Sequence, residues 1–467
     1  EKTGLSSLTP TTLDALNTQP VQLAPLPQDP WMVQELDFYL RDDKIDAEPF
    51  RDELKKLIKR ESASSASAAA ESMEGLTNGD EAATVLKGDT PSRETVPQPP
   101  PKFTDVKKEV QALRDVREQL LRSSKGGMAE PSISCFTFHN TYDTLTCLTT
   151  SPDHSLVCGG FSESYLKVWS LKGDKLRGFK LNANKEVTRE VEGSDSKRLV
   201  GHAGPVYAAR ISSDKKFAIS CSEDATVRLW SLDSYSNLAV YKGHNFPIWD
   251  VDLASNDVYF ATSSFDGTSR LWRTDMINPL RVFVGHESDV DCVKFHPNCN
   301  YVATGGSDGE VRLWNIQKGN TVRVMRSHTG PVMALAFSED GKTLASAGED
   351  KTVKLWDLNS GRLIKSLIGH GDTVYSVAFN GAGTQLVSGG ADQSVIVWNP
   401  NADANEPGMV LKPGGAAYGK PGREKNASPE MVGKFYTKRT PIFNVEYTRS
   451  NVVLAYGPFL GSAAAAV

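Results

Sequence analysis

The most constraining feature of this 467-residue sequence is a unit that recurs every 42 residues. Each unit ends in a tryptophan, at Trp230, Trp272, Trp314, Trp356 and Trp398. A histidine precedes each tryptophan by 28 residues, at His202, His244, His286, His328 and His370. A fixed period in this range indicates an array of identical supersecondary units, each of which buries its apolar face against its neighbours.

Two further columns of residues keep the same phase. A hydroxyl side chain stands ten residues before each tryptophan, at Ser220, Thr262, Thr304, Ser346 and Ser388. An aspartate stands six residues before it, at Asp224, Asp266, Asp308, Asp350 and Asp392. Apolar runs such as 217–219 and 227–230 predict short strands, and Asp-Gly or Asp-Lys pairs predict the hairpin turns between them. This is the pattern of the WD repeat, in which four short strands form one blade of a β-propeller.

The four columns have a structural explanation. A histidine buried at the edge of a blade needs a partner for each ring nitrogen, and the hydroxyl, the aspartate and the tryptophan N–H supply them. An unpaired buried polar group would cost about 1–3 kcal/mol. His202, Ser220 and Asp224 also match the residue types of a hydrolytic triad, but a triad occurs once per site and is not copied into five units. We therefore predict structural tetrads, with no catalytic residue and no metal ligand.

The units at the two ends of the array have lost parts of the pattern. The first ends at Trp169 but carries Thr141, Gly159 and Glu163 in place of the histidine, the hydroxyl and the aspartate. A polar insertion at 173–197 predicts a protruding loop. The last unit has strand-like runs at 442–447 and 452–456 with no following tryptophan. We expect residues 135–138 to complete this blade and close the ring, which removes two open sheet edges.

The predicted fold class is therefore all-β, a seven-bladed WD-repeat propeller preceded by short helical segments and a disordered linker. The chain opens at Glu1 without an initiator methionine or a signal peptide, and we expect a fragment of a longer protein. The expected divisions are a partly helical N-terminal segment (1–60), a low-complexity linker (61–100), an amphipathic helix and connector (101–130), the propeller (131–460) and an Ala-rich tail (461–467). A basic low-complexity loop is expected at 401–433.

Composition limits the possible functions. The net charge is -5 and the pI is near 6.0, so the whole chain shows no electrostatic signature of binding to nucleic acid or to an anionic membrane. Six scattered cysteines without a C-x-x-C pair favour a reducing compartment over a disulfide framework or a zinc site. We expect no cofactor, no small-molecule substrate, no membrane span and no direct nucleic-acid contact.

One column varies among the repeats while its neighbours do not. The position four residues after the repeat histidine is always aliphatic, but the next one varies, as Tyr207, Trp249, Asp291, Met333 and Tyr375. This column begins the innermost strand, near the mouth of the propeller, and large aromatic or Met side chains at such a rim are typical binding anchors. The alternative is that some of them pack between blades. We predict them as a candidate partner-binding rim.

The residues between the repeat columns resemble one family, the WD-repeat subunit of the general transcription factor TFIID, which yeasts share with the SAGA coactivator. The resemblance covers roughly residues 131–460 and is carried by the stretches 241–250, 278–283, 295–304 and 440–443. It implies a non-catalytic nuclear scaffold that binds histone-fold subunits of the same complex and supports RNA polymerase II transcription initiation. The family's N-terminal helical domain and its dimerisation motif are not recognisable here, so dimerisation does not carry over.

Two other classes of protein stay open at this point. Another WD-repeat adaptor, such as a ubiquitin-ligase substrate receptor or a signalling scaffold, would share the fold, although no F-box-like module precedes the propeller. An enzyme with a propeller active site would need carboxylates, metal ligands or a nucleophile that break the repeat pattern. His139, His154 and His296 lie outside the tetrads, and none has a ligand partner at metal-like spacing.

Overall fold

The computed structural model describes residues 17, 21–23, 131–139, 141, 144–181, 187–189, 193–400, 428–448 and 451–459. The chain divides into two compact units, of which Gln22–Ala129 is one, and the propeller belongs to the other. The expected helices within 1–60 and 101–130, the linker 61–100, the part of the expected loop at 401–427 and the tail 461–467 lie outside the described residues, apart from 17 and 21–23.

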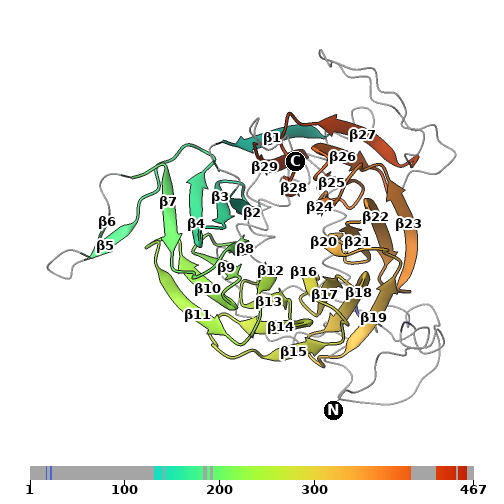
Figure 1. Ribbon diagram of the computed structural model, residues 1–467, viewed down its shortest axis with the longest axis horizontal. Helices are drawn as coiled ribbons and strands as arrows, with labels where there is room; N and C mark the ends of the chain where they lie inside the picture. The colour runs from blue at the N-terminus through green and yellow to red at the C-terminus, as the bar shows by residue number, and fades with distance from the viewer. Residues whose placement is uncertain are drawn as a thin grey trace, which may run out of the picture. The chain divides into compact units, whose positions relative to one another are not determined.

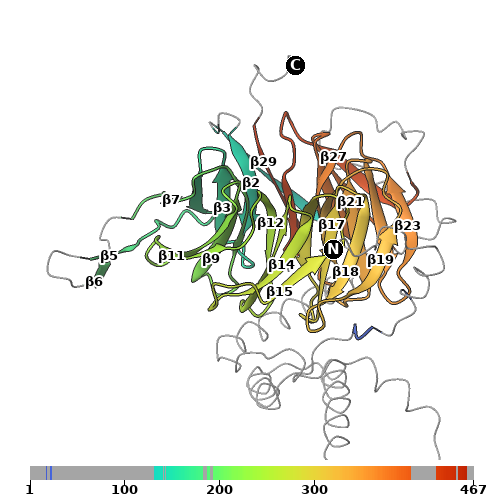
Figure 2. The ribbon, with the colours of Figure 1, turned by 60° about the horizontal axis from the view of Figure 1, so that its bottom comes forward.

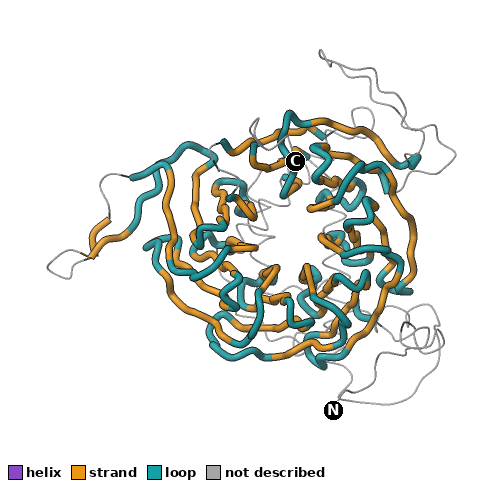
Figure 3. Tube along the Cα trace, in the orientation of Figure 1, coloured by secondary structure: helices purple, strands orange, loops and turns teal. Residues whose placement is uncertain are grey.

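Seven β-sheets stand around a central channel, as the sequence predicts (Figures 1 and 3). The innermost strands of neighbouring sheets contact one another all the way round the ring. Blade 1 consists of β2 (Leu145–Thr150), β3 (Leu156–Phe161), β4 (Tyr165–Ser170) and β7 (Ser196–Val200). Blade 2 consists of β8 (Val206–Ile211), β9 (Phe217–Ser222), β10 (Thr226–Ser231) and β11 (Asn237–Lys242). Blade 3 consists of β12 (Ile248–Leu253), β13 (Tyr259–Ser264), β14 (Thr268–Arg273) and β15 (Arg281–Val284).

The next three blades repeat this antiparallel order from the channel outward. Blade 4 consists of β16 (Val290–Phe295), β17 (Tyr301–Gly306), β18 (Glu310–Asn315) and β19 (Thr321–Arg326). Blade 5 consists of β20 (Val332–Phe337), β21 (Thr343–Gly348), β22 (Thr352–Asp357) and β23 (Arg362–Ile368). Blade 6 consists of β24 (Val374–Phe379), β25 (Leu386–Gly390), β26 (Ser394–Trp398) and β27 (Met431–Tyr436).

Blade 7 joins the two ends of the array and has three strands in the described residues. They are β28 (Asn444–Tyr447), β29 (Val452–Pro458) and β1 (Ser132–Phe138). The strand expected at 135–138 therefore does close the ring, but it pairs parallel to β29, from Ser132 opposite Val452 to Phe138 opposite Pro458. In a four-stranded antiparallel blade, the outermost strand runs in the same direction as the second strand. In blade 7, β1 is the outermost strand and β29 is the second, and no described third strand separates them, so they pair in parallel.

Two expected loops are partly strands. The insertion at 173–197 contains a hairpin of β5 (Phe179–Leu181) and β6 (Val187–Arg189), which projects from the side of the propeller (Figures 1 and 2). Its last residues belong to β7, where Ser196 pairs with Trp169. Likewise, residues 431–433 of the expected loop at 401–433 begin β27, where Met431 pairs with Trp398. In both blades the free edge of the third strand pairs with residues from the end of the expected loop, because backbone hydrogen bonds do not depend on side-chain type.

The core is a ring of apolar clusters between adjacent blades. Trp230 of blade 2 packs in one cluster with Cys158 and Leu199 of blade 1, and Trp272 of blade 3 packs with Ile219 and other residues of blade 2. A blade on its own would expose these faces, so each blade is stable only beside its neighbours.

One residue far from the propeller in sequence also contacts it. The Asn17 side-chain amide donates to the Val324 carbonyl oxygen at 3.3 Å, and its oxygen accepts from the Val324 N–H at 3.2 Å. The amide therefore occupies the free backbone edge of β19, as a neighbouring strand would.

The turn after each tetrad aspartate requires a left-handed residue. Gly267 and Gly309 fill this position in blades 3 and 4, with φ of 71° and 73°. In blade 2 the same position is Ala225, with φ of 57°. A left-handed conformation costs a residue with a Cβ atom about 1–2 kcal/mol.

We expect Ala225→Gly to raise the free energy of unfolding by about 0.5–1 kcal/mol, because relief of this cost exceeds the extra unfolded-state entropy of glycine. Urea unfolding of the full chain measures the change. The matched reverse substitution, Gly267→Ala, should lower stability, since the added Cβ would lie 3.1 Å from the Ser288 carbonyl oxygen. A loss of stability in Ala225→Gly would contradict this account of the turn.

Candidate functional site

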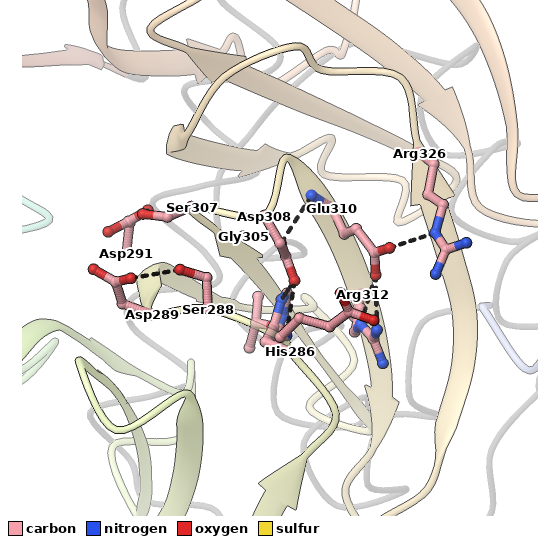
Figure 4. A network of polar contacts seen from close by, with 12 residues as sticks. His286, Ser288, Asp289, Asp291, Gly305, Ser307, Asp308, Glu310, Arg312 and Arg326 are labelled. Carbon is pink, nitrogen blue, oxygen red and sulfur yellow. Dashed lines mark hydrogen bonds and ion pairs between the residues drawn. The ribbon is translucent and has the colours of Figure 1, made fainter. Parts of the chain in front are cut away.

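The tetrad residues of blades 2–6 meet in five hydrogen-bonded networks of one geometry. The histidine Nε2 lies 2.7, 2.9, 2.8, 2.7 and 2.6 Å from the hydroxyl of Ser220, Thr262, Thr304, Ser346 and Ser388. The histidine Nδ1 lies 2.8–3.1 Å from the aspartate in every case. The tryptophan Nε1–H donates to the same hydroxyl at 2.8–3.0 Å. The network of blade 4 includes His286 and Asp308 (Figure 4).

These contacts fix where the protons lie. The ionised aspartate can only accept a hydrogen bond from Nδ1, which leaves Nε2 of the neutral imidazole as an acceptor, so the hydroxyl accepts from the tryptophan N–H and donates its own proton to Nε2. Nδ1 then carries the histidine proton and donates it to the aspartate, and every group in a neutral-imidazole tetrad is satisfied. Ser220 and Thr262 are fully buried. A hydroxyl that is held by a tryptophan N–H and closed off from solvent has no free position for a substrate.

The protein environment shifts the pKa values of the blade 3 pair. Burial raises the pKa of Asp266, but hydrogen bonds from His244 and Thr268 outweigh it and hold that pKa at about 2. Burial lowers the pKa of His244, against the opposing effect of Asp266. The folded protein therefore favours the neutral histidine beside an ionised aspartate.

Blades 1 and 7 have no tetrad, and aromatic packing takes its place in blade 1. The Trp169 ring lies 5.3 Å from Phe138 and 6.2 Å from Phe161, measured between ring centroids. A Cβ at Gly159, the position of the missing hydroxyl, would lie 3.0 Å from the Trp169 ring. The tryptophan has thus moved into the space that a hydroxyl side chain occupies in the other blades.

The five predicted rim residues share one backbone feature, which is a β-bulge. In each of blades 2–6 the ladder between the first two strands skips one residue of the inner strand: Tyr207, Trp249, Asp291, Met333 and Tyr375. Blade 1 skips Thr146 in the same way. A bulge leaves its extra residue unpaired and changes the direction of its side chain. The variable column is therefore the one position of each inner strand that the sheet does not constrain.

All five rim residues line the central channel, a cavity of about 670 Å³. Thr146 and Phe443 line it as well, so that every blade contributes a residue. The sequence analysis did not predict these two. Phe443 follows Ile442, which packs on Gly389 as Val332 packs on Gly305. Phe443 could have been identified from the sequence if the incomplete repeat of blade 7 had been aligned on the aliphatic residue that precedes each rim residue.

The aromatic rim residues form two groups. The Tyr207 and Trp249 ring centroids lie 4.8 Å apart with the rings tilted at 51°, and Trp249 contacts Phe265, which in turn contacts Phe246. Across the mouth, Tyr375 meets Phe443 edge to face at 6.0 Å. Met333 and Tyr375 are 37% and 38% exposed, and Phe246 and Phe265 are each 50% exposed. The rim residues therefore contact one another within the mouth but keep part of their apolar surface in solvent.

Deeper in the channel, charged groups are paired. Asp252 accepts from Lys294 Nζ at 2.8 Å and from the Phe295 N–H at 3.0 Å, and it lies 3.2 Å from Arg210 Nε. Asp250 accepts from the Val293 N–H at 3.1 Å. These contacts tie the inner strands of blades 2, 3 and 4 together, which assigns the channel charges a structural role.

Asp291 at the mouth differs from these paired groups. It accepts from the Ser307 hydroxyl at 2.7 Å, and Asp289 lies close to it on the same strand entry (Figure 4). Burial, with smaller contributions from the charges of Asp289 and Asp308, raises the pKa of Asp291 to about 6 against the opposing hydrogen bond from Ser307. No cation contributes to this balance among the described residues. Asp291 is therefore a rim carboxylate without a positive partner.

The described part of the chain meets the requirements of neither a metal site nor a membrane-spanning helix. No group of three or more His, Cys, Asp or Glu side chains is placed to hold a metal ion there. No described helix is long and apolar enough to cross a membrane. All six cysteines are free thiols.

The repeats match a known family model, WD40, described as WD domain, G-beta repeat. It covers residues 193–231, 235–273, 277–315, 319–357 and 361–399. These are the five units that carry tetrads, so the fold and its hydrogen-bonded networks define the chain as a WD-repeat propeller protein.

Comparison with curated proteins shows which WD-repeat proteins the chain is similar to. The chain is 41% identical over 154 residues to "SAGA complex/transcription factor TFIID complex subunit Taf5" of Schizosaccharomyces pombe, over 33% of this chain and 23% of that protein. It is 40% identical over 144 residues to "Transcription initiation factor TFIID subunit 5" of Arabidopsis thaliana, over 30% of this chain and 21% of that protein. The Drosophila melanogaster protein of the same name is 36% identical over 164 residues, with 32% and 23% covered. The chain is therefore similar, over about a third of its length, to WD-repeat subunits of TFIID and SAGA, and the match spans less than a quarter of each of these relatives.

We expect Ser220→Ala to lower the free energy of unfolding by about 1–3 kcal/mol, because it leaves His202 Nε2 and Trp230 Nε1 unpaired inside the blade. Chemical denaturation of the full chain measures the loss. Ser234→Ala is the matched control, since Ser234 is an exposed turn residue that bonds to Ser236. Equal stability of the two variants would show that the tetrad hydroxyl does not stabilise the blade.

Each buried histidine should make stability fall as the pH falls. Burial lowers the pKa values of His244 and His296 in the folded state, so at these groups the unfolded chain takes up protons first, from about pH 6.5 downward. The pKa of Asp291, raised to about 6, acts in the opposite direction over the same interval, because there the folded state takes up its proton first. The histidine effect is therefore measured as a difference between variants: from pH 7.5 to pH 5.5 the urea midpoint should change in a more negative direction in the parent chain than in His244→Gln. An equal change in the two proteins would contradict the assignment.

Proposed function

We propose that this chain is a non-catalytic docking subunit of a TFIID- or SAGA-type complex, which holds histone-fold subunits in the nucleus and supports RNA polymerase II transcription initiation. The printed names of the S. pombe, Arabidopsis and Drosophila relatives support the transcription-complex part of this proposal. The observation that carries the docking part is the ring of bulged side chains at the channel mouth, which present partly exposed aromatic surface.

The polar residues support a scaffold over an enzyme. Five copies of a Ser/Thr–His–Asp arrangement would be the obvious catalytic groups, and in each of them a tryptophan N–H occupies the hydroxyl. The channel carboxylates Asp250 and Asp252 accept hydrogen bonds from the backbone of the next blade. These groups are used by the fold, which leaves the rim side chains for recognition.

The rim is suited to docking because the fold does not depend on the identity of its side chains. The tetrads, the core clusters and the channel ion pairs hold the backbone, so the rim residues vary from blade to blade without loss of the fold. Large aromatic and Met side chains bury much surface for little lost conformational freedom, which makes them effective anchors at protein interfaces. A rigid ring that presents seven side chains of six residue types suits a subunit whose task is to position others.

Affinity purification of the full chain from nuclear extract tests this function. We expect histone-fold transcription subunits to remain bound at moderate salt and to be lost when residues 131–460 are deleted. A second variant that keeps the fold, Trp249→Ala combined with Tyr375→Ala, should lower their recovery because it removes an anchor on each side of the mouth. The matched control is Trp169→Phe, which keeps aromatic packing away from the mouth.

Mass spectrometry of the bound proteins decides between the open classes. Recovery of cullin-type ligase components or of signalling proteins in place of transcription subunits would support the other adaptor class and sink the transcription assignment. Full recovery of transcription subunits by the rim variant would show that another surface of the chain holds them.

A further inference from the structure

Carboxylates outnumber cations on the channel-mouth face. We define the mouth loops as the segments that enter the inner strands (201–205, 243–247, 285–289, 327–331 and 369–373) and the hairpin turns beside them (223–225, 265–267, 307–309, 349–351 and 391–393). Outside the tetrads these loops carry five carboxylates, Glu223, Glu287, Asp289, Glu349 and Asp372. Lys351 is their single lysine or arginine, and the structure describes every residue of them. In the other two blades, the turn 162–164 adds Glu163 and the entry segment 437–443 adds Lys438 and Arg439, so the described mouth segments carry six carboxylates and three cations.

The mouth carboxylates are not neutralised from within the described chain. None of the five, nor Asp291 on the rim, forms an ion pair with a described residue, while Asp250 and Asp252 below them face Arg210 and Lys294. Lys351 does not serve them either, because its ammonium donates to the Gly371 carbonyl oxygen at 2.8 Å. Like charges that face one another without a counter-charge destabilise the folded state unless a partner compensates them.

Apolar surface stands among these carboxylates. Phe246 and Phe265 belong to the mouth loops themselves and are half exposed, and they continue the Tyr207–Trp249 pair. The face therefore offers apolar contact and negative charge together.

We propose that the mouth face binds a cationic polypeptide segment of a partner protein, with one arginine or lysine side chain entering the mouth beside Asp291. The proposal rests on the docking role given above and names the chemistry of what docks. The aliphatic stem of such a side chain packs on Met333 and Trp249 while its charge meets the carboxylate. An arginine also stacks on aromatic faces, which favours it over lysine here. The outlying carboxylates Glu223, Glu287, Glu349 and Asp372 attract further positive charges of the segment and speed its association.

Charge complementarity decides against other occupants. A nucleic acid would bring phosphates to a face with five unpaired carboxylates, and an acidic segment would meet the same repulsion. A wholly apolar segment would cover the aromatics but would bury Asp291 without a partner, which is costly. A cationic segment satisfies both parts of the surface.

Peptide binding to the purified full chain tests this proposal. The probes are a peptide that repeats Arg-Leu-Ala and two matched peptides with Glu or Ser in place of Arg, followed by calorimetry. We expect the arginine peptide to bind, with an affinity that falls as salt is added, and the other two to bind at least about tenfold more weakly. Equal binding of the serine peptide would show that charge plays no part, and preferred binding of the glutamate peptide would overturn the proposal.

Two substitutions locate the site. Asp291→Asn keeps the size of the side chain and its contact with Ser307 but removes the charge, so it should weaken the arginine peptide about tenfold. Asp233→Asn is the matched control, because Asp233 is an exposed aspartate in a loop at the opposite end of the strands. Unchanged affinity in Asp291→Asn, or an equal loss in Asp233→Asn, would overturn the assignment to the mouth. Equal urea midpoints of the two variants exclude a folding defect as the cause.

The peptide experiment tests this inference and the extract experiment tests the proposed function, so the two proposals can be contradicted independently. A chain that binds the arginine peptide through Asp291 but recovers no transcription subunits from extract would keep this inference and sink the transcription assignment. A chain that recovers those subunits but shows no preference for the arginine peptide would support the transcription assignment and overturn this inference.

Discussion

One hydroxyl group in each of five blades organises the rest of the structure. It accepts the proton of the blade's tryptophan and donates its own to a buried histidine, whose other nitrogen is bonded to the aspartate of the hairpin turn. Four parts of the blade are joined in this way: the loop that enters it, its second strand, its hairpin turn and its third strand. Because all of these groups are buried and each is satisfied, the loss of one member leaves the others unpaired.

The fixed entry loop has a consequence at the channel. It places an aliphatic residue at the start of each inner strand, and the next residue falls in a bulge that the second strand does not pair. Within each repeat the tetrad therefore stabilises the blade, and the bulge presents a side chain at the channel mouth. The tetrad residues are the same in every blade because they complete a network, whereas the bulged residue differs because nothing in the sheet restricts it.

Charged side chains likewise differ between the channel interior and the channel mouth. Inside the channel, Asp252 meets Arg210 and Lys294 from the two neighbouring blades and helps to hold the ring together. At the mouth, Asp291 and the loop carboxylates have no such partners among the described residues. The paired charges stabilise the fold, and the unpaired ones cost stability that a cationic partner would restore.

The sequence by itself determined the repeat, the strands between its columns and the composition of the tetrads, because each depends on residues at fixed short spacings. It also located the rim column, since internal comparison separates a varying position from constant ones. Only the tertiary structure decided that this column is a bulge, that Thr146 and Phe443 complete the ring, and that β1 pairs parallel to β29. These features depend on which strands and loops become neighbours when the ring closes, and residues more than 300 positions apart, such as Ser132 and Val452, carry no local signal of their pairing.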